Sequence, residues 1–183
     1  MNPTLIAIIV VAVLVIAAAA MMISRSRQRE RLRKDFGPEY EHQLHEAEGD
    51  RSKAEAALLK REKRVEKLDI RPLAPEHRAR FADEWQQVQA KFVDDPQRSI
   101  ALADALVAEV MKARGYPVED FEQRAGDLSV DHPRLVQNYR AAHEIAVRHA
   151  RGDGGTEDLR SAFIGYRELF EELLRSEQPE LAH

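Results

Sequence analysis

Acidic and histidine side chains gather in one stretch of the chain, GYPVEDFEQRAGDLSVDHP, at residues 115–133. Asp127, Asp131 and His132 belong to it, and His143 follows on the next predicted helix. Clustered carboxylates are preferred ligands of Mg²⁺ and Ca²⁺, and imidazole and carboxylate groups act as general acids and bases. We call these four residues the acid–histidine cluster, the first candidate for a metal site or an enzyme active site.

The spacing within this cluster favours structural roles over chemistry. It lacks the D-x-D-x-D-G alternation of a calcium loop. It also contains no Glu-x-x-His pair of the kind that a di-metal bundle uses on facing helices, and the pair Glu39 and His42 lies outside it in the predicted stalk. Asp131 can cap a helix, and Glu119 and Asp120 can occupy the first turn of a short one. We therefore predict no metal and no cofactor, with a metal-dependent or histidine–carboxylate enzyme built on residues 115–133 as the alternative.

Other motifs also give no catalytic arrangement. His143 lies four residues after Tyr139 on an apolar stripe, which indicates an interior histidine rather than a catalytic base. The glycines of residues 152–155 are not followed by Lys-Ser/Thr, as a phosphate-binding loop requires. The serines lack the glycines of a nucleophile elbow. We predict that the protein is not an enzyme.

Composition excludes further classes of function. The 183 residues include no cysteine, which excludes disulfides, zinc–thiolate sites and thiol catalysis. The formal net charge is −4, of which residues 25–34 contribute +5, so that residues 35–183 carry −9. Because an acidic domain is repelled by phosphate backbones, we expect no nucleic-acid partner.

Residues 1–24 predict a membrane anchor. The run TLIAIIVVAVLVIAAAAMMI, residues 4–23, contains no charged side chain, and eleven of its twenty residues are Leu, Ile or Val. A helix of that length spans about 30 Å, the thickness of the hydrocarbon core of a bilayer. A cleaved signal peptide is the alternative, because the alanines at 17–20 resemble a cleavage site. The run is too long for one, however, and no basic residue precedes it.

A basic cluster follows the apolar run and predicts the topology. Its members are Arg25, Arg27, Arg29, Arg31, Arg33 and Lys34, with Glu30 as the single acid among them. Basic residues next to a span resist translocation, so the N-terminus is expected outside and the C-terminal part in the cytoplasm. The expected location is the inner (plasma) membrane, crossed once. The same residues could also attract anionic lipid headgroups.

Residues 25–70 predict a charged helical stalk with breaks at Gly37-Pro38 and near Gly49. The run RSKAEAALLKREKRVEKL is rich in helix formers. Apolar positions around it recur at steps of three and four residues, which is a coiled-coil period that two arginines interrupt. Like-charge pairs four residues apart, such as Lys60/Arg64 and Lys63/Lys67, point to contact with something outside the helix. Both a solvated stalk and a self-associating coiled coil stay open.

Residues 71–176 predict a bundle of four to five helices, which makes the fold class all-α. After the prolines at 72 and 75 that end the stalk, apolar stripes of helical period predict helices at about 75–92, 96–114, 118–126, 133–150 and from Thr156 onward. Trp85, Phe92 and Tyr116 could anchor a partner, but we interpret them as core. Residues 177–183 form a polar tail.

Two runs, RPLAPEHRARFADEWQQVQAKFVDDP and GYPVEDFEQRAGDLSVDHPRLVQNYRAAHE, resemble an uncharacterised family of small bacterial proteins with a single N-terminal span. The likeness covers nearly the whole chain, including the basic flank. It implies a bacterial inner-membrane helical protein, and it implies no established activity or site residues.

Together these features predict a membrane-anchored cytoplasmic helical protein that acts as a non-enzymatic interaction or scaffold module. The expected partners are the bilayer and either another protein or a second copy of the chain. Self-association through the stalk is the structural alternative.

Overall fold

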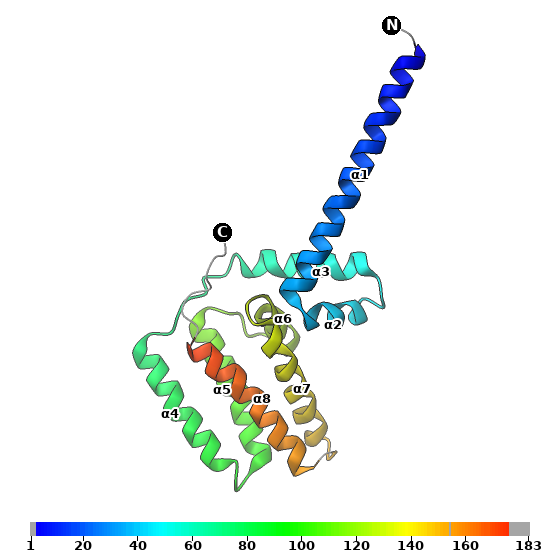
Figure 1. Cartoon of the computed structure of the whole chain (residues 1–183). Helices are drawn as coiled ribbons and strands as arrows, with labels where there is room; N and C mark the ends of the chain where they lie inside the picture. Colours follow the sequence, from blue (N-terminus) through cyan, green and yellow to red (C-terminus); the bar gives the residue numbers. More distant parts are fainter. Residues whose placement is uncertain (1–2, 154, 176–183) are drawn as a thin grey trace.

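The computed structural model describes residues 3–153 and 155–175, and over that range the chain forms eight α-helices and no strand. The polar tail predicted at 177–183 lies outside the described residues. Helix α1 projects from a body formed by the other helices (Figure 1). The helices are α1 (Pro3–Phe36), α2 (Pro38–Glu46), α3 (Arg51–Val65), α4 (Pro75–Lys91), α5 (Pro96–Arg114), α6 (Phe121–Asp131), α7 (Pro133–Ala150) and α8 (Thr156–Arg175).

Local signals in the sequence set most of the helix ends. Gly37 separates α1 from α2 with a positive φ of 49°, a region that glycine enters without steric cost. The side chains of Asp50 and Asp95 cap α3 and α5 by accepting hydrogen bonds from the third backbone N–H beyond them, at 3.1 and 3.0 Å. Gly115 ends α5 in the left-handed conformation.

Helix α6 differs from the expected short helix at residues 118–126. It begins at Phe121, because Asp120 is its cap and accepts a hydrogen bond from the backbone N–H of Gln123 at 2.8 Å. It continues past Gly126 to Asp131, so Gly126 does not end the helix. Asp131 does not cap α7; its carboxylate instead accepts a hydrogen bond from the Tyr116 hydroxyl at 2.7 Å.

Helices α4–α8 share one hydrophobic core, and we call them the bundle. Within the core the Trp85 ring stacks on Phe163 and Phe170, with centroids 5.1 and 4.5 Å apart. Trp85 and Tyr116 are buried, and Phe92 is half-buried against Phe163. These aromatic residues therefore belong to the core, as interpreted from the sequence.

A second, smaller core joins the end of α1 to α2 and α3. It consists of Leu32, Phe36, Tyr40 and Leu58. Helix α3 contacts α2 and α6, and α2 contacts α7, so the segment predicted as a stalk folds back onto the bundle. The α3 side chains Ala54, Leu58 and Val65, which would form the seam of a coiled coil, are buried within the chain.

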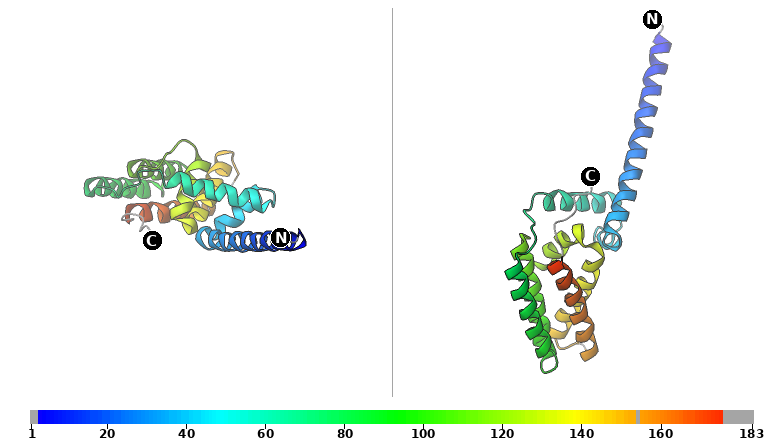
Figure 2. Two further views of the ribbon diagram at one scale, coloured as in Figure 1. Left: turned by 90° about the horizontal axis from the view of Figure 1, so that it is seen from above. Right: turned by 60° about the vertical axis from the view of Figure 1, so that its left-hand side comes forward.

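The apolar part of α1 projects away from this body (Figure 1). By length and composition, Val11–Phe36 is the one stretch of the described residues that could cross a membrane, with a mean hydropathy of 1.3 over a window of 18 of its residues. Its valine, leucine and isoleucine side chains as far as Ile23 are exposed. Helix α1 runs without a break from this exposed segment into the second core (Figures 1 and 2).

Candidate functional site

Charged and neutral polar side chains from four helices meet where α2 and α3 lie against the bundle. We call this group the junction. Its members are Glu39 and Gln43 of α2, Arg61 and Arg64 of α3, Glu122, Asp127 and Ser129 of α6, and Arg140 of α7. It ties the segment that follows α1 to the C-terminal half of the chain.

Glu39 is the centre of the junction. Its carboxylate is fully buried, with no exposed surface, and it accepts hydrogen bonds from Arg61 at 2.9 Å and from Arg140 at 3.0 Å. Arg140 also pairs with Glu122. Burial alone would lower the pKa of Arg140, but its hydrogen bonds with Glu39 and Glu122 outweigh that cost and raise it. Two guanidinium groups thus compensate one buried carboxylate.

Arg61 links α3 to both α6 and α2 by hydrogen bonds. Its guanidinium donates to the Ser129 hydroxyl at 2.9 Å and to the Gln43 amide oxygen at 2.8 Å, besides Glu39. Burial lowers the pKa of Arg61, and Glu39 opposes that shift. Gly126 gives the side chain room, because a Cβ there would lie 3.1 Å from the Arg61 Nε. The glycine inside α6 is therefore explained by this contact.

Asp127 makes the second charged contact between α3 and α6. Its carboxylate is fully buried and accepts a hydrogen bond from Arg64, while its Oδ2 has no partner among the described residues. Burial raises the pKa of Asp127 although Arg64 acts to lower it. A raised pKa means that protonation favours the folded state, so this group adds stability as the pH falls through that pKa.

Three members of the basic cluster form ion pairs with α2 and α3, and the other three face solvent. Arg29 pairs with Glu55 at 2.8 Å, Arg31 with Glu62 at 2.9 Å, and Arg33 with Glu41 at 3.1 Å. Arg25, Arg27 and Lys34 are exposed and have no ion pair with any described residue. Half of the cluster therefore holds α1 against α2 and α3.

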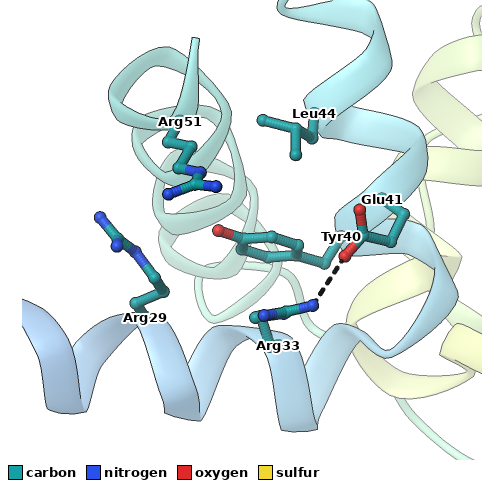
Figure 3. A pocket seen from close by; sticks show the side chains of 6 residues that line it. All are labelled: Arg29, Arg33, Tyr40, Glu41, Leu44 and Arg51. Atoms are coloured by element: carbon teal, nitrogen blue, oxygen red, sulfur yellow. Dashed lines mark hydrogen bonds and ion pairs between the residues drawn. The ribbon is translucent and has the colours of Figure 1, made fainter. Parts of the chain in front are cut away.

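A pocket of about 200 Å³ opens between α1, α2 and α3 (Figure 3). The Arg33 guanidinium lies over the Tyr40 ring, 5.7 Å from its centroid, and the Tyr40 hydroxyl is 3.1 Å from a Glu55 oxygen. Burial and the Glu55 contact raise the pKa of Tyr40. Figure 3 shows three arginines around the ring. The lining residues are Arg29, Arg33, Tyr40, Glu41, Leu44 and Arg51.

The acid–histidine cluster is spread over separate contacts. Asp127 binds Arg64, and Asp131 accepts from Tyr116. The Nδ1 of His132 lies 3.9 Å from a Glu172 oxygen, and His143 stacks on Phe121 with ring centroids 3.6 Å apart. Among the described residues, no three His, Asp or Glu side chains are grouped to hold a metal ion. Each member contacts a different neighbour.

Burial lowers the pKa of both histidines in this cluster. Their folded-state pKa lies below the ordinary value of about 6.5, so the unfolded chain takes up protons that the folded chain does not, and stability falls as the pH drops below that value. We expect the melting temperature to fall by a few degrees between about pH 7.5 and pH 5.5.

The variant His132→Gln/His143→Gln tests this assignment, and His77→Gln, at an exposed position on α4, is the control. The double variant should lose most of the pH dependence and the control should keep it. An unchanged pH profile in the double variant would assign the acid sensitivity to other groups.

Sequence reasoning did not find the junction, since Glu39 and Arg140 are 101 residues apart. The available signals were weak: a glutamate beside Tyr40, and an arginine beside Tyr139 at the edge of an apolar stripe. Comparisons of the chain with protein families, with curated proteins and with solved structures returned no significant match. The resemblance stated from the sequence stays a prediction, and function is argued from the residues themselves.

Proposed function

We propose that the protein is a single-pass inner-membrane protein that holds an acidic helical bundle at the cytoplasmic face, where the bundle serves as a non-enzymatic scaffold for a protein partner. The support comes from α1, whose apolar half is exposed while its last turns enter the core with Leu32 and Phe36. An exposed apolar helix of this length is disfavoured in water, and a bilayer would cover it.

The continuity of α1 into the second core is the observation that carries this proposal. A flexible linker would let the bundle rotate freely below the membrane. Here the helix that would span the bilayer is fixed to α2 and α3 by the second core and by ion pairs of Arg29 and Arg31, and the junction fixes those helices to the bundle. The bundle would then present one defined orientation to a partner.

The surface left for a partner is acidic. Residues 35–183 carry −9, while the large aromatic side chains of the bundle are mostly buried. Such a surface favours partners with basic contact regions, because electrostatic complementarity speeds association and rejects acidic competitors.

Reporter fusions test the topology. A green fluorescent protein fused after His183 should fluoresce, and alkaline phosphatase at the same position should be inactive, because both outcomes require a cytoplasmic C-terminus. The variant Arg25→Glu/Arg27→Glu removes two positive charges that make no ion pair in the described structure. It should weaken the orientation preference and raise the phosphatase signal. A fully active phosphatase fusion of the unaltered chain contradicts the proposed topology.

Photo-crosslinking in cells tests the scaffold role. Val93 and Ile164 are exposed apolar positions on the bundle, 84% and 42% accessible, and a photoreactive residue at either one would label a neighbour within reach. A reproducible crosslinked protein supports the scaffold role. Crosslinks between two copies would indicate self-association instead. If neither another protein nor a second copy is crosslinked, the result contradicts an interaction mediated by the bundle.

A further inference from the structure

The face of α3 opposite the bundle carries lysines and no acid. Ala54, Leu58 and Val65 form the buried face, and at 3.6 residues per turn the opposite face comprises Ser52, Ala56, Lys60 and Lys63, continued by Lys67 in the following turn. All five of these residues are exposed. The three lysines have no ion pair with any described residue, so their charge is uncompensated by the protein.

The acidic side chains of α3 lie on another side of the helix, where arginines of α1 form ion pairs with them. Glu55 pairs with Arg29 and Glu62 pairs with Arg31, and Glu66 follows Glu62 by four residues on that same flank. The ion pairs with α1 therefore neutralise acidic side chains of α3, while the lysines on the other face keep their positive charge. This leaves a basic strip pointing away from the bundle.

The same ion pairs fix the position along the axis of α1 at which α3 crosses it. Arg29 and Arg31 follow the last apolar residue, Ile23, by six and eight positions, so α3 crosses α1 about 10 Å beyond the apolar run. A helix with its side chains has a radius of about 5–6 Å. The outer face of α3 then lies about 5 Å from the hydrocarbon boundary, within a headgroup layer about 5–7 Å thick.

The orientation of α3 fits that position. It runs across the direction of α1 and covers the end of the bundle from which α1 leaves (Figures 1 and 2). If α1 stands along the membrane normal, α3 lies along the membrane plane with its buried face on the bundle and its lysines toward the lipid.

We propose that α3 is a membrane-surface helix whose face of Ser52, Ala56, Lys60, Lys63 and Lys67 docks on the anionic headgroups of the bilayer that α1 spans. The inference rests on the proposed anchoring by α1. Anionic lipids would relieve the repulsion within the pair Lys63/Lys67, which an isolated helix would suffer. Each lysine near such a surface strengthens the contact by about fivefold.

A fluorescent label at Ala56→Cys tests the docking in the full chain, because the chain has no other cysteine. The protein is reconstituted into phosphatidylcholine vesicles with or without phosphatidylglycerol, each containing a lipid with a nitroxide on its headgroup. We expect the label to be quenched several-fold more strongly in the vesicles that contain phosphatidylglycerol. A label at Val93→Cys, in the loop between α4 and α5 at the far end of the bundle (Figure 1), should stay unquenched.

Two charge variants decide whether the lysines cause the quenching. Lys60→Glu/Lys63→Glu should reduce the quenching at position 56 to the level at position 93. Lys91→Glu/Arg98→Glu makes the same charge change at exposed bundle positions and should leave it unchanged. Quenching that ignores phosphatidylglycerol, or that survives Lys60→Glu/Lys63→Glu, overturns the inference.

Flotation of the same vesicles separates this inference from the proposed function. A chain that floats with the vesicles but carries an unquenched label at position 56 is anchored without docking of α3, which overturns the inference alone. A chain that does not float at all refutes the anchoring, and the docking with it.

Discussion

Replacing Glu39 with glutamine should weaken the junction by about 3–5 kcal/mol, the usual cost of removing one partner from a buried ion pair. Glutamine keeps the size of the side chain but removes the negative charge. Arg140 retains Glu122, whereas the remaining hydrogen-bond partners of Arg61, Gln43 and Ser129, are neutral. A buried guanidinium would then lack a counter-charge.

Amide hydrogen exchange in α2 and α3 measures this effect directly. A loss of 3–5 kcal/mol should accelerate exchange in these helices by roughly a hundredfold or more. Glu41→Gln is the matched control, since it removes the same charge from an exposed pair with Arg33 and should cost less than about 1 kcal/mol. Equal effects of the two variants would show that the burial of Glu39 adds nothing.

Replacing Gly115 with alanine should lower the free energy of unfolding of the bundle by more than about 3 kcal/mol. Gly115 has a φ of 100°, and a Cβ there would lie 2.2 Å from the backbone oxygen of Asp69. The neighbouring Arg71 N–H donates to the Arg114 carbonyl at 2.9 Å, which holds the α3–α4 connection against the end of α5. A backbone cannot yield as a flexible side chain can, so this connection must shift.

Gly152→Ala separates the clash from the backbone strain. Gly152 also has a positive φ, 89°, but a Cβ there meets nothing within 4 Å. It should cost only about 1 kcal/mol, the strain of a non-glycine residue in this region. Denaturant unfolding followed by Trp85, the single tryptophan, measures both variants. A Gly115→Ala variant no less stable than Gly152→Ala would contradict the close approach of Asp69.

The helices could be predicted from sequence because their signals are local. A glycine and proline pair separates α1 from α2, an Asp-Pro pair opens α5, and Gly115 closes it. The error at α6 has the same origin. The sequence predicts a helix that ends at about Gly126, but the structure places the Arg61 side chain of α3 against this glycine, a contact that no local pattern encodes.

The junction could not be predicted, since its contacts depend on how the helices pack. The charges of α3 are compatible with a solvated stalk, and only the folding back of α3 onto α6 buries Asp127 and sets Arg61 beside Ser129. The acid–histidine cluster shows the reverse case. Its residues are close in sequence, but each side chain contacts a different neighbour, so they do not converge on one site.

Because α1 is one unbroken helix, the rotation of its apolar segment about the helix axis is fixed relative to the rest of the chain. Because the helix advances about 100° per residue, inserting one residue between Ser24 and Arg29 would turn the whole apolar segment by about 100° and raise it by about 1.5 Å, while the ion pairs below stay in place. Inserting a full heptad would bring the segment back to nearly its original bearing, about 10 Å higher. The apolar segment and the body of the chain therefore keep one fixed rotation relative to each other about the axis of α1.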